Sequence, residues 1–230
     1  MTRSQLKDDL RINLADVGIT FFSEEDLEDS IQDAYDDIVS LTQCIQKNVT
    51  LSWIPNLVYY NFKSLLADYL GTTAIFNTQT NMFLRDDLNL RNLDQLRRDW
   101  EMWVGAPQYW VSSDPDNIVI VPHYIGSFTN GAFFSGAFSS AFFINGATAS
   151  VGTYKLFYWA TAPVLSADSD SFLLAADFED LLEFYVTGDM LEQAEEFTKA
   201  SEYWDKYYNG VTAYKDRVKR VNKSDLLLRI

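Results

Sequence analysis

The sequence has very few of the residues on which metal sites and nucleophilic catalysis depend. Its 230 residues include one cysteine, Cys44, and one histidine, His123, so no internal disulfide can form. Zinc is bound by several Cys or His side chains, and we therefore expect no zinc site. A Ser-His-Asp or Cys-His arrangement would depend on His123 alone, and no G-x-S-x-G motif accompanies it. A single cysteine also fits a reducing compartment.

Phosphate-binding loops, membrane spans and export signals are missing as well. Neither G-x-x-x-x-G-K-S/T nor G-x-G-x-x-G occurs in the chain. Mean hydropathy is −0.14 and no uncharged apolar run reaches about 20 residues, so we expect no membrane-spanning helix. The opening MTRSQLKDDL lacks the apolar core of a signal peptide, which predicts that the protein is not exported.

Basic residues are scarce relative to acidic ones. There are 18 Lys and Arg against 33 Asp and Glu, which gives a formal charge of −15. This balance argues against a surface that grips nucleic acid by its phosphates. Many of the acids fall in SEEDLEDSIQDAYDD and DFEDLLEF, where they alternate with apolar residues at helical spacing. The pattern is typical of solvated helix faces, and the carboxylate pair of a glycosidase is the less favoured interpretation.

Two helices are predicted near the N-terminus. The first spans Thr2–Asp16 and has leucines four residues apart. The second begins at Ser23, which forms a capping-box pattern with Asp26, and it runs for about 22 residues with apolar side chains at spacings of four and three. Phe22 and Leu27 stand at the positions of a hydrophobic staple.

A short strand, two further helices and a β-rich region are predicted next. Residues 48–53 alternate as a strand does, and Pro55 opens a third helix whose pattern can continue through 72–83. A fourth helix is expected from Asn89 to the stop at 105–107. Beyond it the period becomes extended, and strands are predicted at 108–111, 118–124 and 154–160.

Residues 126–150 stand out because they hold four glycines, six phenylalanines and no charge. No Asp, Glu, Lys or Arg occurs from Asn117 through Tyr154. Three interpretations stay open: a long β-hairpin that covers its own sheet, a surface buried against another subunit, and, less favoured without flanking basic residues, a loop that inserts into a membrane. The phenylalanines that the second interpretation would bury against another subunit are Phe128, Phe133, Phe134, Phe138, Phe142 and Phe143.

The C-terminal part predicts helices again. One helix is expected from Asp177 with a bend near Gly188, followed by a long final helix through Val218 and the apolar tail KSDLLLRI. Residues 209–230 hold six basic and two acidic side chains. These charges either complement the dipole of a helix end or form an arm that docks on an acidic partner. The residues expected to dock are Arg217, Lys219, Arg220, Lys223, Leu226, Leu227, Leu228 and Ile230.

Together these elements predict an α+β fold that is mainly helical. The expected architecture is an antiparallel helix bundle with a small β-rich insertion and an extended C-terminal arm. The helical body takes residues 1–105 and 166–222, the insertion takes 106–165 with its Phe-rich hairpin at 126–150, and the docking tail takes 223–230.

Five segments follow one another in an informative order. They are FSEEDLEDSIQDAYDDI near the N-terminus, WEMWVGAPQYW (Trp100–Trp110), IVIVP (Ile118–Pro122), KLFYWATAPVL (Lys155–Leu165) and FEDLLEFYVTGDMLEQAEEFTKASEYWDKYYN (Phe178–Asn209). In this order they resemble the head-to-tail adaptor, or head-completion, proteins of tailed bacteriophages, particularly those of short-tailed phages. The resemblance extends over nearly the whole chain, and no catalytic signature accompanies it.

The resemblance implies a structural virion protein that is not an enzyme and has no cofactor. It implies a homo-oligomeric ring, commonly of twelve copies, that sits beneath the portal at the capsid vertex and carries the next tail component, a nozzle or tail tube. In such proteins a C-terminal arm typically docks on the portal, and residues 215–230 match that role by position. DNA would pass through the channel without specific binding, and assembly would take place in the bacterial cytoplasm without a membrane. The length of the Phe-rich segment departs from the family's pattern, and we assign its six phenylalanines to contacts with a ring neighbour or with the tail.

Two other functions also fit the residues. A soluble, non-viral scaffold module could use the same apolar hairpin as its partner site, and it would bind one-to-one instead of forming rings. A carbohydrate-active enzyme could combine Asp and Glu pairs with tryptophan and tyrosine rings that hold sugars. Against the enzyme, Trp100 and Trp103 share the apolar face of a predicted helix, where we expect them to pack inside.

Overall fold

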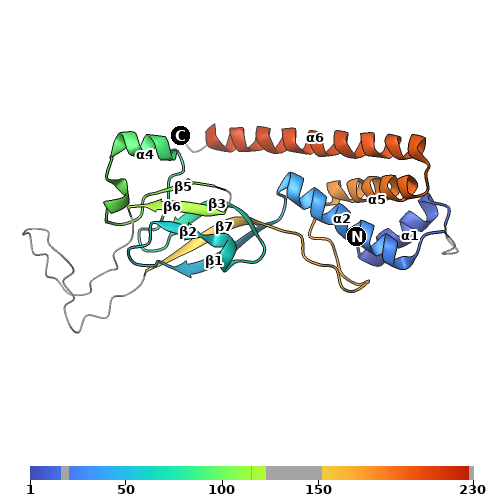
Figure 1. Cartoon of the computed structure of the whole chain (residues 1–230), viewed down its shortest axis with the longest axis horizontal. Coiled ribbons are helices and arrows are strands. Elements are labelled where there is room, and N and C mark those ends of the chain that lie inside the picture. Colours follow the sequence, from blue (N-terminus) through green and yellow to red (C-terminus); the bar gives the residue numbers. More distant parts are fainter. Residues whose placement is uncertain (17–20, 115, 123–151, 228–230) are drawn as a thin grey trace, which may run out of the picture. The chain divides into compact units, whose positions relative to one another are not determined.

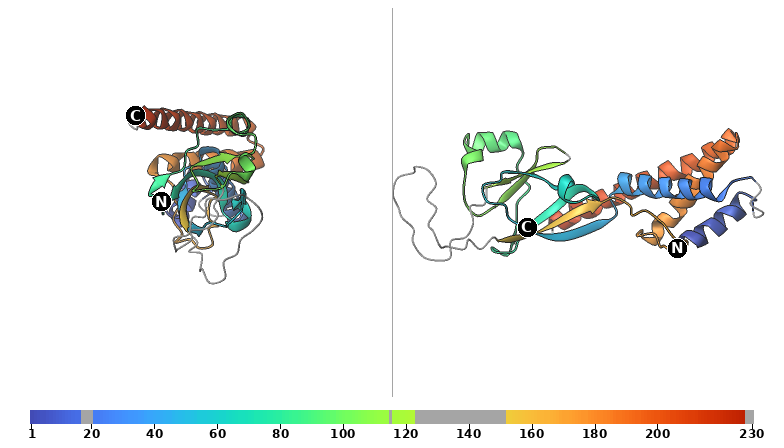
Figure 2. Two further views of the ribbon diagram at one scale, coloured as in Figure 1. Left: turned by 90° about the vertical axis from the view of Figure 1, so that its left-hand side faces the viewer. Right: turned by 60° about the horizontal axis from the view of Figure 1, so that its bottom comes forward.

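The chain forms two compact units. The helical unit consists of residues 1–45 and 160–230, and the β unit consists of residues 46–159. Figure 1 shows their helices and strands, and Figure 2 shows the same ribbon from two further sides. The structure, a computed structural model, describes residues 1–16, 21–114, 116–122 and 152–227.

Four long helices build the helical unit. They are α1 (Arg3–Asn13), α2 (Glu24–Thr42), α5 (Glu179–Gln193), which the short 3-10 turn η2 (Ala176–Phe178) precedes, and α6 (Phe197–Leu227). The predicted capping box of α2 is confirmed, because the Ser23 hydroxyl accepts from the Asp26 N–H at 3.1 Å and the Asp26 carboxylate accepts from the Ser23 N–H at 3.3 Å. A second capping box, Thr2 with Gln5, begins α1.

The core of the helical unit follows the spacing read from the sequence. In α2 the predicted apolar row is buried, with Leu27, Ile31 and Ile38 fully covered. Its main partner is α5, whose Leu182 and Val186 are also fully buried. Each such side chain contributes about 1.5–3 kcal/mol by leaving water, so this row accounts for much of the stability of the unit.

Helices α5 and α6 approach closely at two glycines. A Cβ atom on Gly188 would lie 3.3 Å from the indole ring of Trp204, and one on Gly210 would lie 2.3 Å from Cδ2 of Leu181. Helix α5 continues through Gly188 without interruption, so no break in the helix accompanies the expected bend. Both glycines are explained by the room that the facing helix needs.

The β unit contains two antiparallel sheets. One has the strand order β1-β7-β3-β4 and the other the order β2-β6-β5. The strands are β1 (Gln46–Ser52), β2 (Tyr59–Asn61), β3 (Tyr69–Asn77), β4 (Met82–Phe83), β5 (Tyr109–Ser112), β6 (Asn117–Val121) and β7 (Thr153–Ala160). The helical segments are α3 (Phe62–Leu65), α4 (Leu90–Leu96) and the 3-10 turn η1 (Trp100–Met102).

Aromatic side chains fill the space between the two sheets. Tyr154 of β7 stacks on Trp53, with 4.2 Å between the ring centroids, and contacts Tyr60 of β2 at 6.2 Å. Tyr60 pairs across strands with Ile118 of β6, so the inner face of the three-stranded sheet meets the four-stranded sheet. On the other face of β6, Val119 belongs to a core cluster with residues of α4 and η1. Burial on both faces explains the unbroken apolar run IVIV.

The expectation of a mainly helical bundle is wrong. The chain is an α+β protein with 45% helix and 23% strand, arranged in part as two antiparallel sheets. The third helix expected from Pro55 shrinks to the single turn α3, and instead of continuing that helix, residues 72–83 contain the end of β3, a turn and β4. Tyr69 explains the difference, because it is buried against Tyr158, 89 residues later in the chain. Such distant contacts override local helix preference.

Candidate functional site

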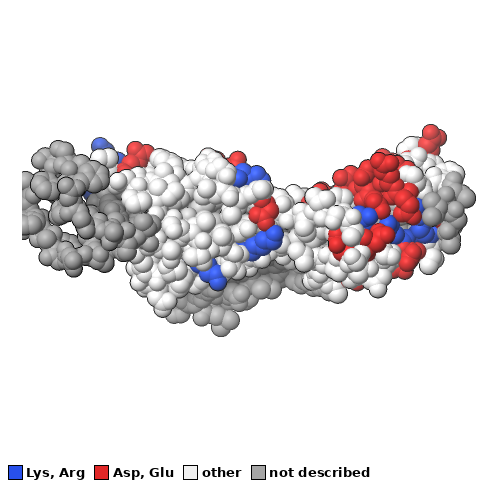
Figure 3. All heavy atoms as spheres, turned by 90° about the horizontal axis from the view of Figure 1, so that it is seen from below, with Lys and Arg blue, Asp and Glu red and all other residues white. Residues whose placement is uncertain are grey.

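Charge is divided unequally between the two units. The helical unit has 25 Asp and Glu against 11 Lys and Arg, whereas the β unit has 8 against 7. The net charge is therefore −14 in the helical unit and −1 in the β unit. Figure 3 shows one face, on which acidic side chains gather over the helical unit and the β unit carries few charged side chains. The two units thus offer surfaces of contrasting chemistry.

An acidic row runs along one face of α2. Glu25, Asp29, Asp33 and Asp36 recur at spacings of four and three, all four are exposed, and α2 contains no Lys or Arg. Burial raises the pKa of the Asp33 carboxyl, and the nearby charges of Asp189, Asp36 and Asp29 raise it further. Crowded carboxylates of this kind repel anions and attract cationic groups.

A second charged cluster contains its own cations and links α1, α2 and the loop before α5. Lys7 Nζ lies 2.9 Å from Glu28 and 2.6 Å from Asp168, and Arg3 lies 2.6 Å from Glu28. Burial lowers the pKa of the Lys7 ammonium, but its hydrogen bonds to Asp168 and Glu28 outweigh that effect and raise the pKa overall. The hydrogen bond from Lys7 in turn lowers the pKa of Glu28. These charges pair within the unit, so we assign them a structural role.

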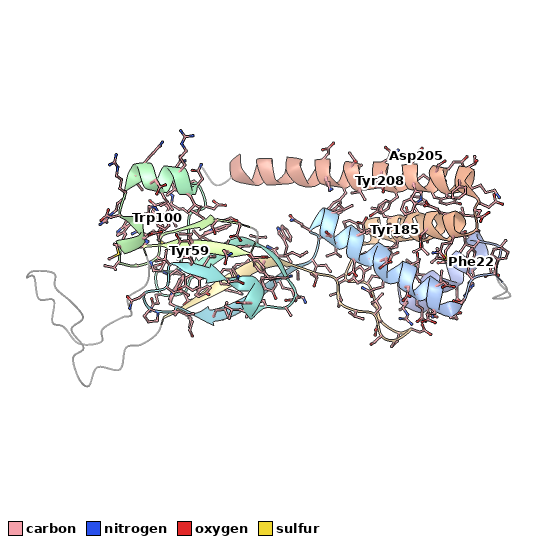
Figure 4. All side chains as sticks on the ribbon, viewed as in Figure 1. Phe22, Tyr59, Trp100, Tyr185, Asp205 and Tyr208 are labelled. Carbon is pink, nitrogen blue, oxygen red and sulfur yellow. The ribbon has the colours of Figure 1, made fainter. Side chains whose placement is uncertain are left out.

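Aromatic side chains fix the first half of α6 on α5 (Figure 4). Tyr185 of α5 packs edge-on against Trp204, with ring centroids 4.9 Å apart, and against Tyr207 at 5.2 Å. Tyr208 is 58% exposed and extends this aromatic group to the surface. Burial raises the pKa of Tyr185 to about 12, and the charge of Asp37 contributes to the shift. The first half of α6 is therefore firmly anchored.

The second half of α6 extends beyond the start of α5, the helix on which the first half of α6 packs. The two helices are antiparallel, since Leu181 near the start of α5 meets Gly210, and Phe178 just before α5 contacts Tyr214 with ring centroids 4.4 Å apart. Residues 215–227 continue the helix beyond that point, for a length of about 20 Å.

The predicted docking residues fall on this projecting part of α6. The structure gives a helical backbone for Arg217, Lys219, Arg220, Lys223, Leu226 and Leu227. The extended arm expected there is therefore wrong as far as residue 227, and the absence of Gly and Pro after Gly210 explains why the helix continues. Leu228 and Ile230 lie outside the described residues.

A further surface, which the sequence reasoning missed, lies on the outer face of the four-stranded sheet. Phe83 of β4 contacts Phe76 of β3, with ring centroids 5.1 Å apart, and Phe157 of β7 at 6.0 Å. Phe83 is 52% exposed, and Lys155 Nζ lies 5.3 Å from the centroid of the Phe157 ring. We call Phe76, Phe83 and Phe157 the outer aromatic patch. The alternation of YKLFYWA puts Phe157 on the same face of β7 as its other outward residues. Its two partners, Phe76 and Phe83, lie in residues 72–83, where the sequence pattern did not predict strands.

Metal and membrane sites find no support in the described part of the chain. Within it, no three His, Cys, Asp or Glu side chains converge as metal ligands. Of the helices described, none is both long and apolar enough to cross a membrane.

One comparison with known proteins is decisive. A family model described as SU10 adaptor protein matches residues 1–226. The chain belongs to this family of phage head–tail adaptors. A comparison with curated proteins found no match.

Membership confirms the resemblance that the five segments gave. The adaptor is a structural protein of the bacteriophage head–tail junction and a component of the virion. The match covers residues of both the helical unit and the β unit.

The Phe-rich contact element predicted for the adaptor lies outside the described residues. This holds for all six of its phenylalanines, which are Phe128, Phe133, Phe134, Phe138, Phe142 and Phe143. It also holds for His123, the single histidine. Their assignment to contacts with a ring neighbour or with the tail stays a prediction.

Proposed function

We propose that copies of this adaptor form a closed ring that joins the portal at the capsid vertex to the tail, with the DNA channel at its centre. The observation that carries the proposal is the match of the adaptor family to residues 1–226, which contains both units and all of α6 except its last residue. The resemblance implies twelve copies and a nozzle or tail tube as the next component.

The segregation of charge supports a ring. Cyclic assemblies with more than two members need two different surfaces on every copy, which meet head to tail. The adaptor has an acidic helical unit, a nearly neutral β unit with exposed aromatic rings, and a basic helix end. Repetition of individually weak contacts around the ring makes the assembly stable through multivalency.

The projecting end of α6 is the proposed portal-docking element. Residues 215–223 hold five Lys and Arg against one Asp. Positive charge near a helix C-terminus stabilises the helix, and it also steers the helix towards an acidic partner. The leucines that follow supply apolar surface for the contact, so the same segment combines recognition with burial.

The acidic row of α2 fits a protein through which DNA passes. Exposed carboxylates repel the phosphate backbone, and a repelling wall lets DNA slide instead of sticking. The row and its neighbour Asp189 together concentrate negative charge without a basic residue on α2. We therefore propose transit of DNA without specific binding.

The proposal is tested by mixing purified adaptor with portal and imaging the mixture by electron microscopy. Wild-type adaptor should add a ring to the portal, and a chain that lacks Ser224–Ile230 should stay folded but fail to join. A matched pair of charge variants refines the test: Lys219→Ala with Lys223→Ala should weaken docking, whereas Lys199→Ala with Lys206→Ala, on the anchored half of α6, should not. Normal assembly of the truncated chain would show that the docking assignment is wrong.

A further inference from the structure

The two sheets of the β unit differ in how their outer faces are covered. In the three-stranded sheet, Val119 and Val121 on the outer face are completely buried in a cluster with Leu93 and Trp100. In the four-stranded sheet, the outer aromatic patch remains partly exposed at Phe83. Contiguous exposed apolar side chains of this kind usually mark an interaction surface.

The chain enters the four-stranded sheet beside this patch. The Trp53 N–H donates to the Gly152 carbonyl at 2.9 Å, and the Thr78 hydroxyl donates to the Thr153 carbonyl at 2.6 Å. The first residues of β7 are thus held from both neighbouring strands, at the end of the sheet where β3 turns into β4. Phe83 lies only two residues beyond that turn, which ends at Asn81.

We infer that the outer aromatic patch receives the Phe-rich segment 126–150 of a neighbouring copy in the ring. The inference rests on the proposed ring and names the contact that closes it. Patch and segment have matching chemistry, because both present phenylalanine and the segment carries no charge. The contact is also heterologous, because the segment of one copy meets the patch of the next. Each copy offers one segment and one patch, as a closed ring requires.

The length of the segment permits contact with a neighbour. Residues 123–151 amount to 29 residues, whose fully extended length is at most about 100 Å, or about 50 Å if the chain doubles back. The longest strand of the sheet, β3, has nine residues and covers about 30 Å. The segment is therefore long enough to extend beyond its own sheet, and its six phenylalanines outnumber the three rings of the patch.

Disulfide crosslinking between two different single-cysteine chains tests the inference. In a Cys44→Ser background, one chain carries Phe83→Cys and the other Phe138→Cys, and the two are mixed, with and without portal, and oxidised. We expect a crosslinked heterodimer in the mixture. Phe76→Cys provides a second position at the patch. Met102→Cys is the matched control, since Met102 is 76% exposed but lies on η1, which covers the other sheet, and we expect no link from it.

Each outcome decides a separate point. A chain that carries both Phe83→Cys and Phe138→Cys and links only to itself would overturn the inference in favour of a segment that covers its own sheet. Rings on the portal without any link at position 83 or 76 would also overturn it and leave the proposed function standing. A link between copies without rings would support this contact and contradict the proposed ring. Absence of both rings and links would overturn both.

Discussion

The hydroxyl of Tyr207 on α6 donates a hydrogen bond to the Asp37 carboxylate on α2 across 2.5 Å. The two residues are 170 positions apart in the sequence, and the Tyr207 side chain is fully buried. Burial raises the pKa of the Tyr207 phenol, and the hydrogen bond to Asp37 raises it further. A polar contact therefore ties the anchored half of α6 to the edge of the acidic row.

Replacing Tyr207 with phenylalanine should lower the free energy of unfolding by about 1–3 kcal/mol. The substitution keeps the ring but removes the donor on which Asp37 depends. Urea unfolding followed by circular dichroism measures the loss. Tyr208→Phe is the control, because its exposed hydroxyl should contribute less than about 0.5 kcal/mol. Equal effects of the two substitutions would contradict the structural role of the Tyr207 hydrogen bond.

The free energy of unfolding of the adaptor should fall at alkaline pH, and ionisation of the Tyr185 phenol should contribute to this fall. Its pKa is about 12 in the folded chain, mainly through burial, against about 10 for an unfolded chain. A raised pKa favours the protonated phenol, so its contribution is complete below about pH 10 and is lost as the pH approaches 12. Urea midpoints at pH 8, 10 and 11 should fall less steeply for Tyr185→Phe than for the wild-type chain. Identical slopes would show that Tyr185 ionises without consequence for the fold.

Gly210→Ala should destabilise the helical unit although alanine is the better helix former. The added Cβ would come within 2.3 Å of the buried Leu181 side chain, and overpacking typically costs about 1–3 kcal/mol. The gain in helix propensity of about 1 kcal/mol offsets only part of that cost. Gly71→Ala is the matched control, since nothing lies within 4 Å of the new methyl group. Calorimetry should give a lower Tm for Gly210→Ala and an unchanged or higher one for Gly71→Ala.

The loop after α1 should depend on the buried pair Arg11–Asp16. Arg11 Nη1 donates to Asp16 at 2.7 Å, and the same carboxylate accepts from the Phe21 and Phe22 N–H groups at 3.0 Å. Asp16→Ala leaves the buried Arg11 without this partner, which typically costs about 3–5 kcal/mol.

Asp168→Ala serves as the control for that loss. Asp168 also pairs with cations, but its side chain is 60% exposed, so we expect a cost below about 1 kcal/mol. Urea unfolding compares the two variants, and a small effect of Asp16→Ala would show that the loop does not need the ion pair.

The elements that the sequence predicts correctly are those whose capping residues or periodicity lie within a short stretch of the chain. Ser23 and Asp26 are three residues apart, so their capping box was visible without any tertiary information. The alternation that predicted β7 was equally local, and its Tyr154 and Leu156 are buried as a period of two requires. The helix expected from Pro55 fails for Tyr60 and Tyr69, because the rings that they contact, Tyr154 and Tyr158, belong to a strand far along the chain.

The candidate surfaces also differ in whether the sequence alone could predict them. The acidic row of α2 could be read from the sequence, because helical spacing alone places Glu25, Asp29 and Asp33 on one face. The outer aromatic patch could not, because Phe83 meets Phe76 and Phe157 only through the pairing of β4 with β3, which lies beside β7 in the sheet. No local pattern records which strands meet in a sheet.

The sequence by itself determined the excess of acid, the shortage of catalytic and metal-binding residues, the capped helices and the family. Only the tertiary structure decided that nearly all of the net negative charge belongs to the helical unit, that the described strands of residues 46–159 form two sheets, and that three phenylalanines from different strands form one patch. The physical reason is range: capping and periodicity act over a few residues, whereas burial and strand pairing depend on partners that the chain supplies tens of residues away.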